Sequence, residues 1–361
     1  MNKKIGIITF HCSYNYGSAL QAYALQKYLN KNYSDTKIID FVLKKNFEQY
    51  YIFRYTYYKK IKYFFEDLKY FKKNMRRRKS FIEFKKKYFS LTQKTYYDSK
   101  KMGELNNEFD TFICGSDQIW NAACTNGLNP AYFLKFVNNK NKKIAYAPSI
   151  AHLNFDEKIL QKYKDYISEF DAISVREEST VNILMPLTNK KIEVVLDPTL
   201  LLEKNDYMEI TQQPKEKKYI FVYMLEDIDL QLINYVKKIS ENTGLKVIYL
   251  LRDDIKEFKN AKNVYGISPN EFLGYIENAT YIITNSFHAT VFSIIFEKKF
   301  CTFKTKLSYS RMVDLLTKLN LSSRIYDENF DMNQDIDYSV VSNLLAKLKQ
   351  SSINYLERNL I

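Results

Sequence analysis

Short apolar runs alternate with segments of helical spacing along most of this chain. The runs are rich in Ile, Val, Leu, Phe and Tyr, and continuous runs of this kind are typical of parallel strands buried on both faces. They lie at residues 4–10, 37–42, 109–114, 143–147, 171–175, 192–196, 219–223, 246–251, 281–284 and 300–303, with a shorter one near Val264. The pattern predicts two successive sets of parallel strands.

Helical segments separate these strands. Ala19–Leu29 follows Ser18 and Gln21, whose spacing fits a capping box, and another helix is predicted after Ser268-Pro269. Further helices are predicted at 227–241, 287–296, 310–319 and 340–360. The alternation of strand and helix predicts an α/β protein with two Rossmann-like domains that face one another across a cleft.

The domain boundaries follow from the same pattern. Residues 1–202 are predicted to form the N-terminal Rossmann-like domain, and the polar segment 203–218, which contains Pro214, is predicted to be a linker. Residues 219–335 form the second Rossmann-like domain and residues 336–361 a closing C-terminal helix.

The net charge of +14 is concentrated in one segment. Residues 44–88 contain 16 Lys and Arg but only 4 Asp and Glu, together with many Tyr and Phe residues. We expect residues 46–90 to form a basic, aromatic helical insertion in the first domain, and expect 44–88 to contact the anionic inner face of the cell membrane. A solvated helical hairpin is the plainer alternative. Nucleic acid is not an expected partner, because no recognition module accompanies the charge.

The cysteines, the histidines and the lengths of the apolar runs indicate whether metal sites or membrane-spanning segments are expected. The four cysteines form no Cys-x-x-Cys pair and there are only three histidines, so no metal site is expected. No apolar run approaches the ~20 residues of a membrane span, and the first run is too short for a signal peptide. A cytoplasmic protein, peripheral at the membrane, is expected.

Unusual polar residues follow the predicted strands. His288 stands in the first turn of an apolar helix, after the N-cap residues Asn285 and Ser286, where free backbone N–H groups favour an anion. A hydrogen bond from His288 to a nearby carbonyl is the plainer interpretation. Arg176 directly follows another strand, and its planar guanidinium suits a carboxylate or phosphate, although a salt bridge to Glu177 or another surface carboxylate would also explain it.

Five of these stretches together resemble the polysaccharide pyruvyl transferase family. They occur in the family's order: Asn15-Tyr16-Gly17-Ser18-Ala19-Leu20-Gln21, Gly115-Ser116-Asp117-Gln118-Ile119-Trp120, Ser174-Val175-Arg176-Glu177, Asp197-Pro198 and Ser286-Phe287-His288-Ala289. The resemblance covers roughly residues 4 to 320, least well over 46–90. It implies a fold like the GT-B glycosyltransferases. It also implies transfer of an enolpyruvyl group from phosphoenolpyruvate to a sugar, closing as a pyruvate ketal, with phosphoenolpyruvate as co-substrate and no cofactor.

The resemblance also implies roles for individual residues. His288 and Asp117 are the catalytic candidates, although Asp117 would equally serve as a helix cap. Arg176, Ser286, Asn285 and Arg311 are the donor-binding candidates. The acceptor side is assigned to Asn15, Tyr16, Gly17 and Trp120. The expected acceptor is a sugar of a capsule, cell-wall or other exopolysaccharide, or its lipid-linked oligosaccharide precursor.

One departure from the family pattern affects the donor site. Many members carry an arginine two positions before the histidine, where this chain has Ser286. The missing cation is expected to come from Arg311, with Lys304 and Lys306 as weaker candidates, and His11 and His152 are weak candidates for other roles. A GT-B glycosyltransferase with a nucleotide-sugar donor and a non-catalytic sugar-binding family member are the alternative functions.

Overall fold

The computed structural model describes residues 3–33, 35–43, 62–151, 156–225, 230–258, 260–304 and 309–360. Residues 44–61 of the basic segment, His152 and Lys306 lie outside this description. The chain divides into two compact units. The first comprises Met1–Tyr51, Lys85–Leu202 and Leu345–Ile361, and the second comprises Ile52–Phe84 and Glu203–Leu344.

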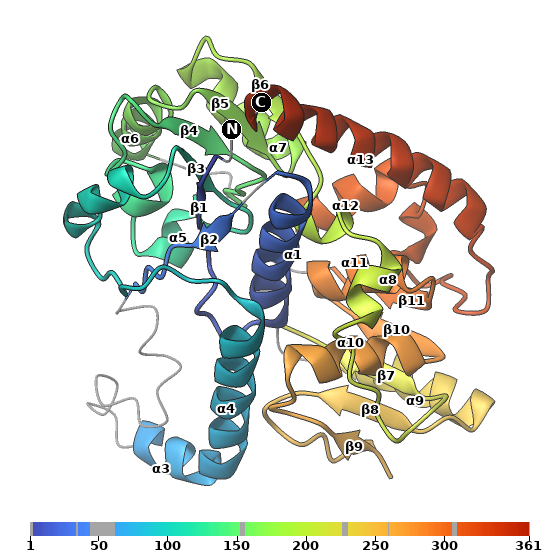
Figure 1. The fold of residues 1–361 in the computed structure, drawn as a ribbon. Coiled ribbons are helices and arrows are strands. Elements are labelled where there is room, and N and C mark those ends of the chain that lie inside the picture. Colours follow the sequence, from blue (N-terminus) through green and yellow to red (C-terminus); the bar gives the residue numbers. More distant parts are fainter. Residues whose placement is uncertain are drawn as a thin grey trace. The chain divides into compact units, whose positions relative to one another are not determined.

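A six-stranded parallel sheet forms the centre of the first unit (Figure 1). Its strands are β1 (Ile5–Ile8), β2 (Thr36–Ile38), β3 (Thr111–Cys114), β4 (Lys142–Ala145), β5 (Ala172–Val175) and β6 (Ile192–Val194). The strands are ordered β2-β1-β3-β4-β5-β6, so the direction of winding reverses between β1 and β3. In open α/β sheets, ligands bind outside the carboxyl ends of the strands at such a reversal.

Helices connect these strands. They are α1 (Tyr16–Asn32), α5 (Ala122–Thr125), α6 (Glu157–Ile167) and α7 (Glu178–Leu184), with the 3-10 turns η3 (Ser99–Lys101), η4 (Gly103–Asn107), η5 (Pro130–Phe133), η6 (Met185–Leu187) and η7 (Pro198–Leu200). The closing helix α13 (Tyr338–Leu360) is held to this sheet over its later turns. Ser352 Oγ accepts from Leu196 N at 2.9 Å, and Tyr355 OH donates to Ala145 O at 2.9 Å.

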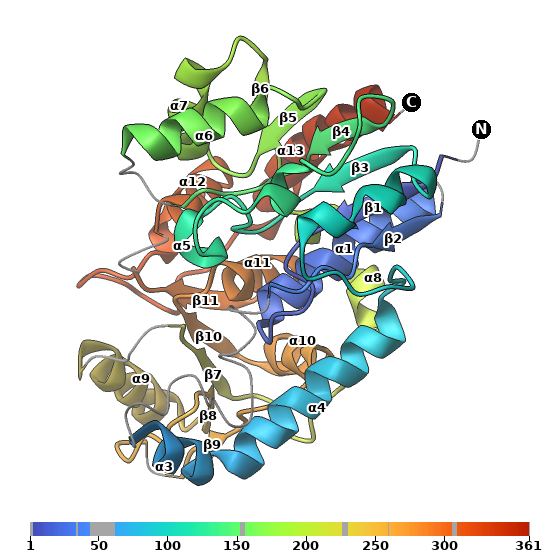
Figure 2. The ribbon, with the colours of Figure 1, turned by 90° about the vertical axis from the view of Figure 1, so that its left-hand side faces the viewer.

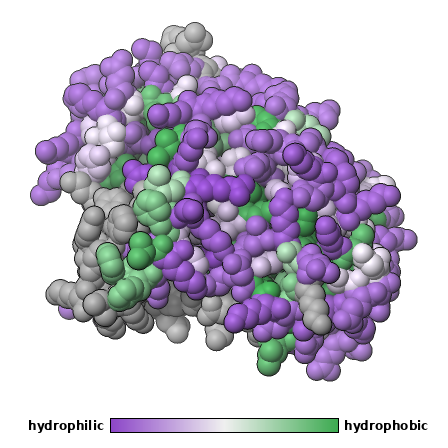
Figure 3. Space-filling view, turned by 90° about the horizontal axis from the view of Figure 1, so that it is seen from below, coloured by the Kyte–Doolittle hydropathy of each residue, from purple (hydrophilic) through white to green (hydrophobic). Residues whose placement is uncertain are grey.

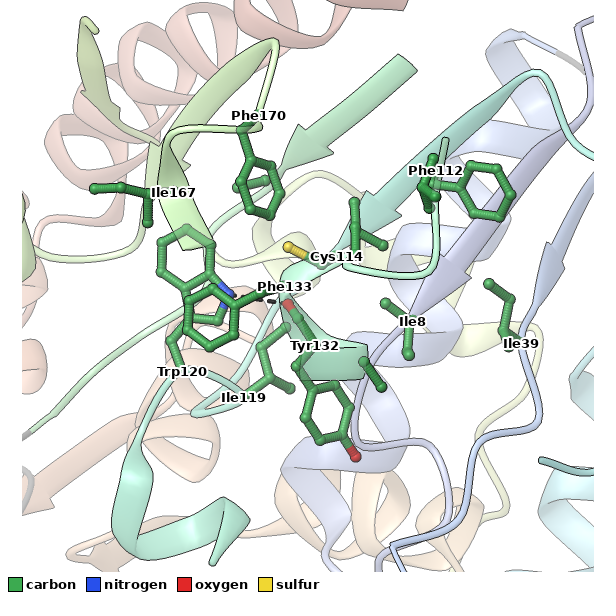
Figure 4. Packing of buried hydrophobic residues seen from close by; sticks show 14 of the residues in the cluster. Ile8, Ile39, Phe112, Cys114, Ile119, Trp120, Tyr132, Phe133, Ile167 and Phe170 are labelled. Atoms are coloured by element: carbon green, nitrogen blue, oxygen red, sulfur yellow. Dashed lines mark hydrogen bonds between the residues drawn. The ribbon is translucent and has the colours of Figure 1, made fainter. Parts of the chain in front are cut away.

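The core of the first unit contains the single tryptophan (Figure 4). Trp120 is 0% exposed and stacks on Phe133, with ring centroids 5.0 Å apart. Its indole Nε1 donates to the backbone oxygen of Tyr132 at 3.0 Å. A buried indole with its N–H paired is a stable core element.

A five-stranded parallel sheet forms the centre of the second unit. Its strands are β7 (Ile220–Tyr223), β8 (Val247–Leu250), β9 (Lys262–Asn263), β10 (Tyr281–Thr284) and β11 (Lys299–Thr302), in the order β11-β10-β7-β8-β9. Its helical elements are α3 (Lys62–Lys69), α4 (Phe71–Tyr88), α8 (Lys204–Met208), α9 (Leu230–Thr243), α10 (Pro269–Asn278), α11 (Phe287–Ile295), α12 (Tyr309–Lys318) and η8 (Ser322–Arg324); α4 ends in the first unit. The winding reverses between β7 and β10.

The strand pattern predicted from the sequence is confirmed, and two local predictions are wrong. Asn15, and not Ser18, is the N-cap of α1, so that helix begins three residues earlier than predicted. The described part of the basic segment up to Phe84 belongs to the second unit and not to the first, because α4 is bonded to the loops after β8 and β9 (Figure 2). The segment predicted as a linker contains the short helix α8.

Among the described residues, no helix is both long and apolar enough to cross a membrane.

Candidate functional site

The structure places three of the five resembling motifs at the reversal points of the two sheets and the other two after β5 and β6. In the first unit, the loop after β1 and the loop after β3 meet at the reversal point. Ser18 Oγ, on α1, donates to Asp117 Oδ2 at 2.6 Å. Gln21 reinforces this junction, because its Oε1 accepts from Ser116 N at 3.1 Å and its Nε2 donates to Thr9 Oγ1 at 2.8 Å. Ser18 and Gln21 therefore join two loops instead of forming the predicted capping box.

Asn15, Tyr16 and Gly17 form the start of α1 at this junction. Asn15 Oδ1 accepts from Ser18 N at 3.1 Å, which satisfies one of the free N–H groups of the first helical turn. Asn15 is partly exposed, whereas Tyr16 and Gly17 are buried. Of the three predicted acceptor residues, Asn15 has the most accessible side chain, and the acceptor role of all three stays a prediction.

Asp117 is held in an uncommon backbone conformation at the same junction. Its φ is 72°, and its Oδ1 accepts from Gln118 N at 2.8 Å. Gly115 has φ +124°, and a Cβ there would lie 1.9 Å from Tyr146 O, so the close approach of the backbone that follows β4 requires glycine. Both carboxylate oxygens of Asp117 accept hydrogen bonds, but the N-cap of the next helix, α5, is Asn121 and not Asp117. Its catalytic role stays a prediction.

Arg176 follows β5 and is surrounded by carboxylates. Its Nη1 lies 2.7 Å from Asp197 Oδ2, its Nη2 lies 3.8 Å from Asp117 Oδ1, and its Nε lies 3.8 Å from Glu177 Oε2. Burial would lower the pKa of Arg176, but the charges of Asp197, Asp117 and Glu177 outweigh it and raise that pKa. Arg176 thus makes the salt bridge of the alternative interpretation, with Asp197 as its nearest partner. An anionic donor would have to compete with these carboxylates.

Trp120 does not occupy the position expected of a sugar-binding residue. Its side chain is 0% exposed and packs among Phe133, Phe170 and Tyr132 in the core (Figure 4). The acceptor role predicted for Trp120 thus finds no accessible side chain in this structure and stays a prediction. The motif needs a large aromatic residue there to fill the core behind the loop that carries Asp117.

A second polar cluster in the first unit is built around His11, at the end of the strand β1. His11 Nε2 lies 2.8 Å from Asp40 Oδ1 and 3.0 Å from Cys12 Sγ, and Thr95 Oγ1 donates to Asp40 Oδ2 at 2.6 Å. Burial of His11 would lower its pKa, but the Cys12 sulfur and the Asp40 carboxylate outweigh that effect and raise the pKa to about 9. Apart from His11, a weak candidate, none of these residues is predicted from the sequence. Their position at the carboxyl ends of β1 and β2 is the signal that could find them.

His11, Cys12 and Asp40 also have the composition of a metal-ligand group, with ligand atoms within 4.8 Å of one another. A cation between them would compete with an ammonium group, because Lys85 Nζ lies 2.8 Å from Asp40 Oδ1 and 3.3 Å from Cys12 Sγ. The lysine supplies the positive charge that the carboxylate needs, so we interpret the cluster as a hydrogen-bonded charge network.

In the second unit, Asn285 and Ser286 organise the reversal point between β7 and β10. Asn285 Oδ1 accepts from Leu225 N at 2.7 Å, which ties the loop after β7 to the loop after β10. Ser286 is the N-cap of α11, and its Oγ accepts from Ala289 N at 3.4 Å. Both side chains hold backbone in place, and their donor-binding roles stay predictions.

His288 and Arg311 are brought to the same aromatic side chain. His288 stands second in α11 and is 8% exposed, with its ring centroid 5.2 Å from that of Phe287. The guanidinium of Arg311, on α12, lies over the Phe287 ring at 5.7 Å, a cation–π contact. A further bond, from Thr290 Oγ1 to Met312 Sδ at 3.4 Å, links these two helices. Arg311 therefore lies close to the His288 motif, as expected. Lys304, the weaker candidate for the missing cation, is exposed.

Comparison with known proteins decides the family. A family model described as polysaccharide pyruvyl transferase matches residues 15–306, which include all five motifs. The chain belongs to the polysaccharide pyruvyl transferase family. The family assignment supports a transferase. No curated protein matches the chain significantly.

Solved structures similar to this pyruvyl transferase family member confirm its fold class. A UDP-GlcNAc 2-epimerase from Methanocaldococcus jannaschii, in complex with UDP-GlcNAc and UDP, matches with a TM-score of 0.50 and 13% identity, covering 98% of this chain and 99% of the other. A putative UDP-N-acetylglucosamine 2-epimerase from Listeria monocytogenes has a TM-score of 0.54 and 9% identity, covering 99% and 90%. At these identities the likeness establishes the fold alone, two Rossmann-like domains of the GT-B type.

Proposed function

We propose that this protein transfers an enolpyruvyl group from phosphoenolpyruvate to a sugar of a cell-surface polysaccharide or of its lipid-linked precursor. The product is a pyruvate ketal. The observation that carries the proposal is the family match over residues 15–306 together with the position of its motifs at the carboxyl ends of strands, three of them at the sheet reversals.

The reaction sets clear chemical requirements. A proton must be added to the methylene carbon of the enol, two sugar hydroxyls must form bonds to the adjacent carbon, and inorganic phosphate must leave. The two hydroxyl protons balance the proton added to carbon and the one carried away by phosphate. An acid, a base and a cationic pocket for the donor's carboxylate and phosphate are needed.

The second unit offers the donor pocket in this proposal. His288 stands in the first turn of α11, where the helix dipole and the backbone N–H groups favour an anion. Arg311, across the ring of Phe287, supplies a cation in place of the arginine missing at position 286. We assign His288 to proton transfer or to binding of the donor phosphate, and Arg311 to binding of the donor.

The first unit contributes the groups that hold the acceptor in this proposal. Asn15 and Asp117 lie at its reversal point, and Asp117 is the candidate base for the sugar hydroxyl. Arg176 is assigned here to positioning, because its salt bridge to Asp197 and its proximity to Asp117 keep the loops after β3, β5 and β6 together. The resemblance implies that Arg176 binds the donor, and this role is retained only as the alternative.

The experiment measures product formation by wild type and His288→Ala with phosphoenolpyruvate and lipid-linked sugars. We expect the variant to keep its circular dichroism spectrum and to lose turnover by at least about a hundredfold, as for removal of a general acid or base. Asn359→Ala, at the end of α13, is the control that should keep activity. Turnover of His288→Ala within about tenfold of wild type, ~1.4 kcal/mol of barrier, would remove His288 from proton transfer.

A further inference from the structure

Helix α3 and the beginning of α4 expose large apolar side chains. Phe65 is 60% exposed, Leu68 57% and Met75 43%, and Phe64 and Phe71 are 42% and 37% exposed. Contiguous exposed apolar residues on a soluble protein commonly mark an interaction surface. We call these five residues the apolar face.

Their spacing places them on one side of each helix. In α3, Phe64 and Phe65 are four and three residues before Leu68, and in α4, Phe71 and Met75 are four residues apart, so each set shares a face of its own helix. A basic residue directly follows each of Leu68, Phe71 and Met75. Together with one more at position 79, this gives the exposed basic side chains Lys69, Lys72, Arg76 and Lys79. A basic stripe therefore borders the apolar face.

The opposite side of the helices is fixed to the second unit. Tyr70 OH donates to Asp253 Oδ1, Lys73 Nζ lies 3.1 Å from Asp254 Oδ1, and Ser80 Oγ donates to Gly266 O at 2.9 Å. Gly266 has φ +84°, and a Cβ there would lie 3.0 Å from the backbone N of Arg77, so the two backbones approach closely. Polar contacts thus hold α3 and the first turns of α4 to protein, Phe81 and Phe84 are buried later in α4, and the apolar face is presented to solvent.

The basic stripe is available to a partner. Lys69, Arg76 and Lys79 make ion pairs of 3.5 to 3.8 Å with Asp253, Glu271 and Glu83, and their side chains are 54% to 77% exposed. Exposed pairs of this length are weak and exchange readily for other anions. Figure 3 shows the molecule from below relative to Figure 1, which is the side on which α3 lies. Hydrophobic and hydrophilic residues are next to one another on this side.

We propose that the apolar face and the basic stripe dock on an anionic lipid surface, with α3 lying in the headgroup plane. Apolar side chains that enter the interface beside cations that meet lipid phosphates are the two features that amphipathic membrane-surface helices combine. The charge complementarity selects an anionic bilayer in preference to a neutral one. Docking is a property of α3 and α4, so it does not depend on the transferase reaction, and it would bring the protein to lipid-linked acceptors.

The test is flotation of the full chain with vesicles of phosphatidylcholine alone or with added phosphatidylglycerol. We expect at least about tenfold more protein on the anionic vesicles, and less binding at high salt. The double variants Phe65→Ser/Leu68→Ser and Lys72→Glu/Lys79→Glu should each lower anionic binding by about tenfold or more.

Matched controls come from helix α9 of the same unit. Leu230, 72% exposed, and the exposed Lys238 are replaced in Leu230→Ser and Lys238→Glu, which should bind like wild type. Circular dichroism confirms that all variants are folded. Equal binding to both vesicle types, binding to neither, or unchanged binding by the Phe65→Ser/Leu68→Ser variant would overturn the proposal.

Discussion

Removing the Arg176 side chain should destabilise the first unit strongly. The guanidinium is buried against Asp197, with side-chain exposures of 2% and 0%, and Asp117 and Glu177 also face it. Breaking a buried ion pair by removing one partner typically costs about 3–5 kcal/mol, because the other charge is left buried without compensation.

The structure places the expected loss near the lower end of this range. Asp197 keeps hydrogen bonds from Thr199 N at 3.1 Å, Thr199 Oγ1 at 2.7 Å and Ser116 Oγ at 3.2 Å when Arg176 is replaced. We therefore expect Arg176→Met, which preserves much of the volume, to lower the free energy of unfolding by about 3 kcal/mol. For a domain of this size, that loss lowers the Tm by roughly 6–12 °C.

Fluorescence of the single tryptophan provides the assay. Trp120 is buried in the core of the first unit, so urea unfolding followed at its emission reports on that unit. Arg358→Met is the matched control, because Arg358 binds Glu193 at 2.7 and 2.8 Å in the same unit but is 54% exposed. The control should lose less than about 1 kcal/mol.

A double variant separates the ion pair from packing. Asp197→Asn added to Arg176→Met should recover about 1 kcal/mol or more, because the uncompensated carboxylate is removed. If Arg176→Met loses less than about 1 kcal/mol and behaves like Arg358→Met, the structural role is refuted. If the same variant instead binds phosphoenolpyruvate more weakly than wild type, Arg176 would again be assigned to binding of the donor.

Two further predictions concern the polar residues near the strand ends. Arg311→Ala should raise the dissociation constant of phosphoenolpyruvate by at least about tenfold, ~1.4 kcal/mol, in calorimetric titration, while the exposed Lys304→Ala should not; wild-type affinity in Arg311→Ala would contradict the donor assignment. The pKa of His11, about 9, lies above its ordinary value of 6.5, so the stability it contributes is complete below about pH 6.5 and is lost as the pH rises through about 9. That contribution is about 3 kcal/mol, and urea unfolding between about pH 6 and 10 should show this loss in wild type and a smaller loss in Asp40→Asn, because the Cys12 sulfur also raises the pKa; parallel curves would disprove the coupling.

Much of the fold could be predicted because each strand is a local pattern. β10 occupies Tyr281–Thr284 as predicted, and β7, β8 and β11 differ from prediction by one residue at one or both ends. Buried parallel strands leave continuous apolar runs, which are visible without any tertiary information. No helix is predicted at 157–167, although Asp156 caps α6 and the buried Tyr163 and Ile167 have helical spacing.

The errors arise where distant segments decide the outcome. The pattern at Ser18 and Gln21 fits a capping box, but Ser18 bonds to Asp117, ninety-nine residues away. The described part of the basic segment up to Phe84 belongs to the second unit through bonds to residues 253, 254 and 266, which nothing in its own composition indicates. The same holds for Lys85, which meets Asp40 from forty-five residues away.

The candidate site could be predicted in its motifs but not in its contacts. His288 and Ser286 stand at the start of α11 as predicted, because an N-cap pattern before an apolar run is a local signal. The burial of Trp120 and the carboxylates around Arg176 depend on how β3, β4, β5 and β6 align, which one sequence does not specify. The sequence therefore identified Arg176 and its neighbour Glu177 but not its nearest partner, Asp197.

Release of inorganic phosphate from phosphoenolpyruvate is the most direct measurement of the proposed function. The purified protein is incubated with phosphoenolpyruvate and a panel of lipid-linked sugars, and both phosphate and the sugar product are measured. We predict phosphate release that requires one of the sugars, equals the pyruvate ketal formed, and disappears in His288→Ala. Release of a nucleoside diphosphate from a nucleotide sugar, with phosphoenolpyruvate left intact across the panel, would contradict a pyruvyl transferase and favour a glycosyltransferase.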